Sequence, residues 1–229
     1  MPPRRPARAR PGVEAPAPPR LAPALDEVTL DLSEPADLHD VSIIAVTGEG
    51  DLDDLELVGC VLDGVHLTAL SARRVRLTDV VLRNCELSGL DLTEARLRRV
   101  RIEGCRAGML EAGMVTVEDL DVIDSKLTEA GFRMATLERA HVEGCDLAGL
   151  ELIDGRLESV EFVSCDLTGA DVSRARMADV RFRRSTLDGM LGVEALAGAT
   201  IDPAQLVPVA LALFASLGIA LDDPEAPPG

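Results

Sequence analysis

The chain has 229 residues, 47% of them hydrophobic, and a formal net charge of −17. This charge excludes a protein that binds nucleic acid by neutralising phosphates, because such binding needs a surplus of lysine and arginine. Aromatic residues make up only 2% of the chain, with no tryptophan or tyrosine, whereas an irregular globular core is normally filled by such large side chains. The composition therefore favours a fold built from small repeated units.

The first 24 residues are rich in proline and arginine. Residues 1–23 hold eight prolines, and residues 1–20 hold five arginines against one acid, Glu14. The segment has no apolar run that would form the core of a signal peptide or of a packed element. We therefore expect residues 1–24 to be a disordered, mildly basic tail and the protein to be cytoplasmic.

Residues 25–50 carry a weaker pattern. Val28, Leu30 and Leu32 alternate with polar residues, as in an extended strand. Leu38 and Ile43 lie five residues apart but one residue out of register with the repeat that follows. Because a stack of repeats must cover its terminal unit, we expect residues 25–50 to form an imperfect N-terminal capping coil.

A five-residue repeat runs through residues 51–190. Stepping by five from Leu52 to Leu187 gives 28 positions, and each is Leu, Ile, Val, Phe, Met or Ala. A second apolar position, mostly small, lies two residues earlier, as at Cys60 and Val65, and the other three positions are mainly polar. Two inward residues separated by one outward residue indicate extended chain, and the remaining polar residues fit a corner. An α-helix would instead need a period of about 3.6 residues.

A longer period, four repeats long, sets the number of sides. It places a small residue at the same inward position six times, at Cys85, Cys105, Ser125, Cys145, Cys165 and Ser185. Glycines recur at two corners, where a positive φ suits them: Gly64, Gly104, Gly144, Gly89, Gly149, Gly169 and Gly189. Four repeats therefore make one coil. The 28 repeats predict about seven coils, which form a rod about 34 Å long at a strand spacing of about 4.8 Å.

The repeat resembles that of the pentapeptide-repeat family, whose pattern is of the type A(D/N)LXX. Residues 85–89 (CELSG), 165–169 (CDLTG) and 170–174 (ADVSR) fit it well, and the resemblance covers about residues 50–190. It implies an all-β fold, a right-handed quadrilateral β-helix. The family prefers alanine at the small inward position, where this chain often has valine, leucine or cysteine, so we expect slightly expanded coils.

A C-terminal cap is predicted over residues 191–221, with a short α-helix at about residues 203–217. Asp202 followed by Pro203 is a helix-start signal, because aspartate caps a helix and proline suits its first position. Gly218 suits the stop. The helix would cover the open end of the last coil.

The same helix has more apolar surface than a cap needs. Pro208 lies inside it and predicts a bend or a loose first turn. The stretch of residues 206–221 is short for a bilayer span, and residues 222–229 are predicted to be a disordered tail. Two apolar sides predict a homodimer through the helix, with cap and dimer contacts at Leu206, Val207, Val209, Leu211, Leu213, Phe214 and Leu217.

The sequence predicts no catalytic residue, no cofactor and no metal site. All five cysteines occupy the small inward position, where a thiol packs as a small hydrophobic group and lacks a base to ionise it. Three histidines, His39, His66 and His141, are too few and too scattered for a zinc site. The acids recur as repeated solvated positions, so no two stand out as an acid–base pair.

One side of the predicted rod is more acidic than the others. It holds nine acids and four arginines, a net charge of −5. The arginines are Arg73, Arg74, Arg133 and Arg174. The acids form the candidate partner face and are Asp51, Asp53, Asp54, Asp91, Glu94, Glu111, Glu151, Asp154 and Asp171. A basic cluster lies around the next corner, at Arg96, Arg98, Arg99 and Arg101. Ordinary solubilising charge is an alternative explanation of this bias.

Several apolar residues fall at outward positions. Met109, Met114 and Met134 lie at corners, and Ile123 and Ile153 lie at mid-side positions. These residues form either a contact patch or the scattered apolar exposure that any protein surface shows.

The family resemblance implies an interaction protein. Some members bind type II topoisomerases: an acidic rod, dimerised through its C-terminal end, resembles duplex DNA and shields the enzyme from quinolone-like inhibitors. We therefore expect a non-catalytic protein-binding module, with DNA gyrase or topoisomerase IV as the most specific candidate partner and no direct contact with nucleic acid or membrane. A general scaffold or adaptor with another protein partner and no DNA mimicry is the alternative.

Overall fold

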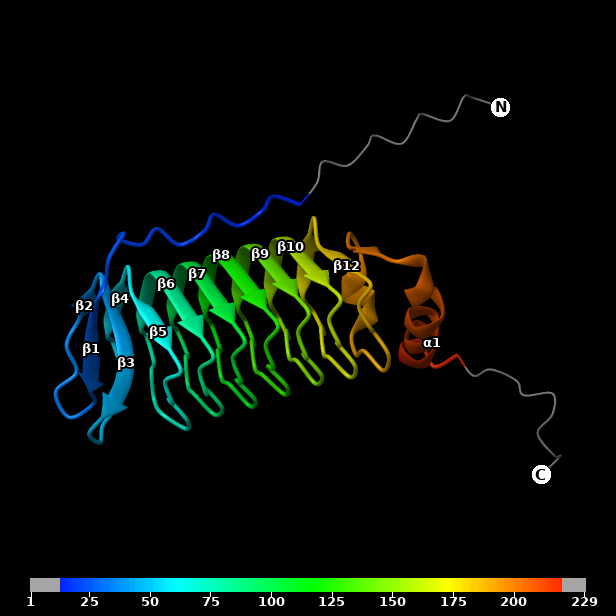
Figure 1. The fold of residues 1–229 in the computed structure, drawn as a ribbon. Helices are drawn as coiled ribbons and strands as arrows, with labels where there is room; N and C mark the ends of the chain where they lie inside the picture. Colours follow the sequence, from blue (N-terminus) through cyan, green and yellow to red (C-terminus); the bar gives the residue numbers. More distant parts are fainter. Residues whose placement is uncertain (1–12, 220–229) are drawn as a thin grey trace.

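The computed structural model describes residues 13–219 as a right-handed quadrilateral β-helix with one α-helix at its C-terminal end (Figure 1). Successive coils stack in parallel into one 13-stranded sheet that winds around the rod. Each long strand covers two sides of the rod, and isolated bridges join the other two. The strands are β1 (Asp26–Asp31), β2 (Leu38–His39), β3 (Val41–Thr47), β4 (Glu56–Val58), β5 (Val61–Asp63), β6 (Arg76–Arg83), β7 (Arg96–Glu103), β8 (Thr116–Ile123), β9 (Thr136–Glu143), β10 (Arg156–Val163), β11 (Arg176–Ala178), β12 (Arg181–Arg183) and β13 (Thr200–Ile201).

The long strands pair at an offset of four repeats, as the sequence predicts. Arg76 of β6 pairs with Arg96 of β7, and this offset continues through β10. Side chains at the five-residue steps point into the rod, where Leu87 is 2% exposed, Leu147 3% and Leu167 0%. The predicted apolar core is therefore confirmed, because each coil delivers the same position to the same wall.

Every corner of these coils has a residue with left-handed backbone. Gly64, at a predicted glycine corner, has a φ of 68°. Asp79 and Arg99 adopt the same conformation, with φ values of 58° and 51°, although it costs an L-residue about 1–2 kcal/mol. Hydrogen bonds between coils hold the corners, as where the Asn84 N–H donates to the Glu103 carbonyl at 2.9 Å. The stacked geometry therefore imposes a φ that residue type alone would not select.

The stack continues beyond the seven coils of the regular repeat. Strand β1 pairs with β3, and β3 with β5, so that there are about nine parallel turns. Leu38 pairs with Leu57, and Ile43 with Leu62, an offset one residue shorter than in the later coils. The one-residue shift seen in the sequence therefore occurs where the first turns pair with the regular coils. Ile43 is fully buried, so these turns extend the same core.

Two short 3-10 turns and one helix follow the last coils. They are η1 (Val193–Leu196), η2 (Pro203–Gln205) and α1 (Leu206–Ser216). The helix predicted at about residues 203–217 is therefore a 3-10 turn followed by an α-helix. Pro208 lies in the first turn of α1, where an amide would have no partner within the helix. Within residues 13–219, no helix is long and apolar enough to cross a membrane.

The cap also satisfies backbone amides of the last coil. The Asp202 carboxylate does not cap its own turn but accepts the Arg184 N–H. The Gln205 side-chain oxygen accepts the Leu187 N–H at 3.1 Å. Because no further coil stacks on this edge, the two side chains replace the carbonyls that a next coil would supply.

An extended N-terminal segment runs along the outside of the rod, beside β6 to β8 (Figure 1). The Arg20 N–H donates to Asp79 at 2.8 Å and the Ala17 N–H to Asp119 at 3.0 Å. These contacts correct the expectation of a disordered tail for residues 13–24, because the rod offers acceptors that composition does not reveal. We call residues 13–25 the N-terminal strap. The other parts of the predicted tails, residues 1–12 and 222–229, lie outside the described residues.

Candidate interaction surfaces

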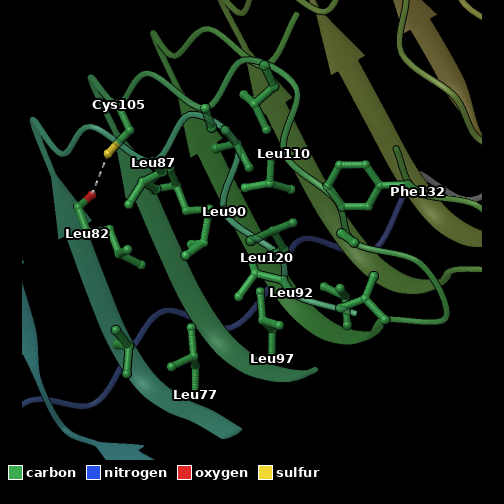
Figure 2. Close-up of a pocket in the computed structure, with 18 of the residues that line it drawn as sticks. Leu77, Leu82, Leu87, Leu90, Leu92, Leu97, Cys105, Leu110, Leu120 and Phe132 are labelled. Atoms are coloured by element: carbon green, nitrogen blue, oxygen red, sulfur yellow. Dashed lines mark hydrogen bonds between the residues drawn. The ribbon is translucent and has the colours of Figure 1, made fainter. Parts of the chain in front are cut away.

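The inside of the described rod is lined by apolar side chains. A cavity of about 110 Å³ follows its axis, and Leu82, Leu87, Cys105 and Phe132 are among the residues around it (Figure 2). The Cys105 thiol donates to the Leu82 carbonyl at 3.6 Å. This interior carries packing and offers no set of polar groups for chemistry.

All five cysteines are buried in the wall of the rod, as predicted. Burial raises the pKa of the Cys60 thiol. The contact with Cys105, together with burial, raises the pKa of Cys85 above its usual range. Cys60 and Cys85 therefore stay protonated and pack as small hydrophobic groups.

The histidines lie on separate parts of the rod. His39 belongs to β2, His66 forms a bridge on another side, and His141 belongs to β9. The His141 ring nitrogens lie 3.4 Å from Glu143 and 3.8 Å from Glu161. Among residues 13–219, no group of three or more His, Cys, Asp or Glu side chains is arranged to hold a metal ion.

The acidic face is the side formed by residues 51–54 and their equivalents in each later coil, through 171–174. Stacking turns its sequence positions into columns along the rod. One column runs by successive bridges through Asp91, Glu111, Gly131, Glu151 and Asp171. The corner column beside it holds Asp54, Arg74, Glu94, Met114, Met134, Asp154 and Arg174. The predicted Asp51 and Asp53 lie in the first of these coils.

Arginines of neighbouring coils neutralise part of the acidic face. The guanidinium of Arg74 donates to both carboxylate oxygens of Asp54, and that of Arg174 to both of Asp154. These hydrogen bonds lower the pKa of both carboxyls. Three ion pairs with N–O distances of 2.6 to 2.7 Å cross the face: Arg74–Asp54, Arg133–Glu151 and Arg174–Asp154.

Exposed methionines lie at both corners that border the middle of the acidic face: Met114 and Met134 in its own corner column, and Met109 at the corner that precedes it. Met109 is 61% exposed, Met114 46% and Met134 56%. Met109 and Met114 flank Glu111 in one coil, and Met134 follows Met114 in the next. We call these three residues the methionine patch. Stacking thus places Met114 and Met134 in adjacent coils of one column, whereas the sequence shows them only as separate outward positions.

The predicted basic cluster does not form a free basic patch. Stacking places an acid of an adjacent coil beside three of its four arginines. The pairs, with N–O distances of 3.5, 2.6 and 2.6 Å, are Arg98–Glu118, Arg99–Asp79 and Arg101–Asp121.

Helix α1 presents an apolar surface away from the rod. Val209 and Leu213, two of the seven residues predicted for cap or dimer contacts, pack against the core of the rod. The other five are 36% to 66% exposed: Leu206, Val207, Leu211, Phe214 and Leu217. Val207, Leu211 and Phe214 lie within about 60° of one another around the helix and form its open side. Leu206 and Leu217 lie at its two ends, on the stripe of Leu213.

The corner beneath the strap is an arrangement that the sequence did not predict. We call its four residues, Asp79, Arg99, Asp119 and Arg139, the covered corner; they follow one another at steps of one coil. Arg99 donates to both oxygens of Asp79 at 2.6 Å, and Arg139 Nε to Asp119 at 2.8 Å. The alternation of acid and arginine at this spacing was the signal that would have revealed the ladder.

Both acids of the covered corner are held ionised. The hydrogen bond from Arg99 is the main cause that lowers the pKa of Asp79. Burial raises the pKa of Asp119, but hydrogen bonds from Arg139 and from the Ala17 amide outweigh it, so that the pKa is lowered. Both carboxylates are therefore acceptors at neutral pH.

Comparisons with known proteins identify the repeat but not a close relative. A model of the pentapeptide repeat region matches residues 115–191, and a model of eight pentapeptide repeats matches residues 60–99. A search of curated proteins finds no match.

The rod is also similar to solved structures at low identity. A trypsin-treated form of QnrB1, a plasmid-mediated fluoroquinolone resistance protein, is 14% identical, with 82% of this chain and 99% of that chain covered and a TM-score of 0.34. Full-length QnrB1 is 15% identical, with 84% and 100% covered and a TM-score of 0.29. The pentapeptide repeat protein Rfr23 from the cyanobacterium Cyanothece 51142 is 17% identical, with 59% and 90% covered and a TM-score of 0.19.

The matched residues coincide with the parallel coils. Residues 60–99 span β5 to β7, and residues 115–191 span β8 to β12. In both segments four five-residue repeats make one coil, and the central residue of each repeat points inward. The chain therefore belongs to the pentapeptide-repeat family.

Proposed function

We propose that this protein is a non-catalytic rod that binds a protein partner through its acidic face. The observation that carries this proposal is the methionine patch, three apolar side chains that are 46% to 61% exposed at the two corners bordering the acidic face. Exposed methionine does not make a corner more soluble, and polar residues occupy the positions equivalent to Met114 and Met134 in other coils, as at Glu94 and Asp154.

The patch has the composition of a protein–protein interface. Such interfaces have an apolar centre, enriched in methionine and arginine, and a polar rim. Methionine also adapts its shape to a partner. Glu111 lies between Met109 and Met114, and its carboxylate lies over Gly131 of the next coil. Glu94 on one side and the Arg133–Glu151 pair on the other supply charged groups for the rim.

A type II topoisomerase, DNA gyrase or topoisomerase IV, is the specific partner that we propose. Nine acids on one side support this choice, together with the membership of the family. However, a 34 Å length of duplex DNA carries about 20 negative charges, whereas the acidic face has a net charge of −5. Because arginines pair with Asp54 and Asp154, charge mimicry alone is a weak source of affinity, and the proposed contact depends on the methionine patch as well.

We also propose that two copies of the chain join through α1. A helix that is apolar all round is stable in water when both of its sides are covered. The rod covers the side of Val209 and Leu213, which leaves the side of Val207, Leu211 and Phe214. A second copy with the same surface covers it in a two-fold symmetric contact.

Supercoiling by purified gyrase, with and without a quinolone, tests the proposed partner. We expect micromolar protein to change supercoiling or to reduce quinolone-stabilised cleavage. The triple variant Met109→Ser, Met114→Ser, Met134→Ser should need at least about tenfold more protein, the effect of losing about 1.4 kcal/mol of binding. Ile123→Ser, an outward apolar residue of a different side, is the control and should act like the wild type.

A lack of any effect of the wild-type protein removes gyrase as the partner but not the acidic face as the binding surface. A photo-crosslinking residue at position 134 then tests the face in cells that contain the protein. We expect crosslinks to a protein from position 134 and none from position 143, which is exposed on the opposite side of the rod. The opposite result contradicts the proposed surface.

A further inference from the structure

The N-terminal strap has the periodicity of a polyproline II helix. Between residues 13 and 25, every third residue is half-buried and those between are exposed. A polyproline II helix has three residues per turn, so this pattern places one ridge of the helix against the rod. The half-buried residues are Val13, Pro16, Pro19, Ala22 and Leu25.

The repeat of the strap matches the repeat of the rod. The two strap amides that bind carboxylates, those of Ala17 and Arg20, are three residues apart. Their acceptors, Asp119 and Asp79, lie two coils apart along the covered corner. One turn of polyproline II spans about 9.3 Å, and two coils span about 9.6 Å. Successive turns of such a peptide therefore meet equivalent acids along the corner.

The strap has backbone N–H groups at the two positions that face carboxylate acceptors of the rod. Residues 16, 18, 19 and 23 are prolines, which have no N–H. Ala17 and Arg20 stand among them and are the residues whose N–H groups reach the acids. Arginines fix those acids in place, because Arg99 binds both oxygens of Asp79 and Arg139 binds Asp119.

Burial shows that the strap selects one of the four corners. Asp79, Arg99 and Asp119 are only 6% to 8% exposed, whereas Arg74 and Glu94, corner residues of the acidic face, are exposed. Along the covered corner itself, Asp179 lies farther from the strap contacts and is also exposed. The corner beneath the strap is thus a desolvated, polar track with fixed acceptors.

We propose that the covered corner is a recognition track for proline-rich peptides in the polyproline II conformation, and that residues 13–25 are its resident ligand. The track accepts a hydrogen bond from a backbone N–H at two positions three residues apart. It packs against a small or apolar residue at every third position. Proline is accepted wherever no N–H is required, as at Pro16, Pro18 and Pro19. A peptide with this spacing binds the track from solution once the resident strap is displaced.

Fluorescence anisotropy with a labelled peptide of residues 13–25 tests this proposal on the full chain. The protein variant Ala17→Pro, Arg20→Pro removes both strap amides and retains the polyproline II conformation. We expect saturable binding of the peptide to this variant and at least tenfold weaker binding to the wild-type protein, whose strap competes in cis. Absence of binding to a variant with wild-type circular dichroism overturns the proposal.

Two matched peptides show whether the track reads the amides. The Ala17→Pro peptide loses one amide and should bind the variant protein at least tenfold more weakly. The Ala15→Pro peptide, changed at an exposed position, should bind like the unchanged peptide. Equal binding of the two peptides overturns the proposal.

Amide hydrogen exchange of the wild-type chain gives a test that does not depend on how the variant folds. We expect the Ala17 and Arg20 amides to exchange at least tenfold more slowly than those of Ala15 and Leu21. Equal exchange rates at these four amides contradict the proposal.

Discussion

Arg139 Nε donates to Oδ1 of Asp119, which lies one coil earlier in the same column, and the same oxygen accepts the Ala17 N–H of the strap. One carboxylate therefore joins two coils to each other and both to a segment 102 residues away in sequence. This column therefore links successive coils to each other and also binds the strap.

Burial, not geometry, should decide which of the ion-pair ladders matter for stability. The Asp79–Arg99 and Asp154–Arg174 pairs are both bidentate, with side chains 11% and 10% exposed in the first and 44% and 68% in the second. Asp79→Ala leaves a buried guanidinium without its partner and should lower the free energy of unfolding by about 3 kcal/mol. Urea unfolding followed by circular dichroism measures this loss.

Asp154→Ala is the matched control, and its unfolding midpoint should stay close to that of the wild type because water screens the exposed pair. A loss of equal size in both variants would show that burial of the covered corner is unimportant.

The apolar core should be sensitive to single truncations. Leu167 is fully buried, and Leu167→Ala should lower the free energy of unfolding by about 3 kcal/mol through lost transfer energy and a residual cavity. Leu191→Ala, at a residue that is 57% exposed, should have little effect. Urea unfolding of both variants checks this, and similar midpoints for the two would contradict the inward placement of the five-residue steps.

Much of this core could be predicted from the sequence because period and burial coincide. The five-residue steps through Leu87 and Leu167 and the four-repeat spacing of Cys85 and Cys105 depend only on repetition, and the parallel pairing follows from it. The strap could not be predicted in the same way. Its contacts use backbone amides of Ala17 and Arg20, which leave no side-chain signature, and its proline content is typical of disordered tails.

Which side of α1 faces the rod could also not be predicted from the sequence. Leu211 and Leu213 are equally apolar, and only the approach of the helix to the last coil decides that Leu213 packs inward while Leu211 is 48% exposed. The ion pairs of the acidic face could have been predicted from the sequence, since Arg74 follows Asp54 by four repeats, which is one coil.

Acid should release the strap. The pKa values of Asp79 and Asp119 lie below the 3.8 of an ordinary aspartate. For such groups the stabilisation is complete above the ordinary pKa and is lost as the pH falls through it toward the lowered value. Arg99, Arg139 and Arg20 face these carboxylates and keep their charge throughout, and Glu118 also lies beside Arg139.

The NMR signal of the Ala17 amide reports this release directly. We expect its chemical shift to stay constant from about pH 7 to about pH 5 and to move toward the free position only below about pH 4, where the carboxylates protonate. A transition between about pH 5 and pH 7 would point to a histidine instead of the two aspartates.

The open side of α1 should carry the proposed dimer. Leu211→Asp places a charge in the centre of that side and should give a monomer in size-exclusion chromatography with light scattering. Ser216→Asp, at an exposed residue about 140° around the helix from Leu211, is the control and should remain a dimer. A wild-type monomer at all concentrations would contradict the proposed contact.

The distance between spin labels along one column tests the stacking of four-repeat coils most directly. Residues 66, 86 and 186 belong to a single column joined by successive bridges, and the five native thiols are buried from the label. Double electron–electron resonance should give about 29 Å between labels at 66 and 186, which are six coils apart, and about 24 Å between 86 and 186, at about 4.8 Å per coil. Distances that do not shorten by one coil spacing for every four repeats would contradict the solenoid.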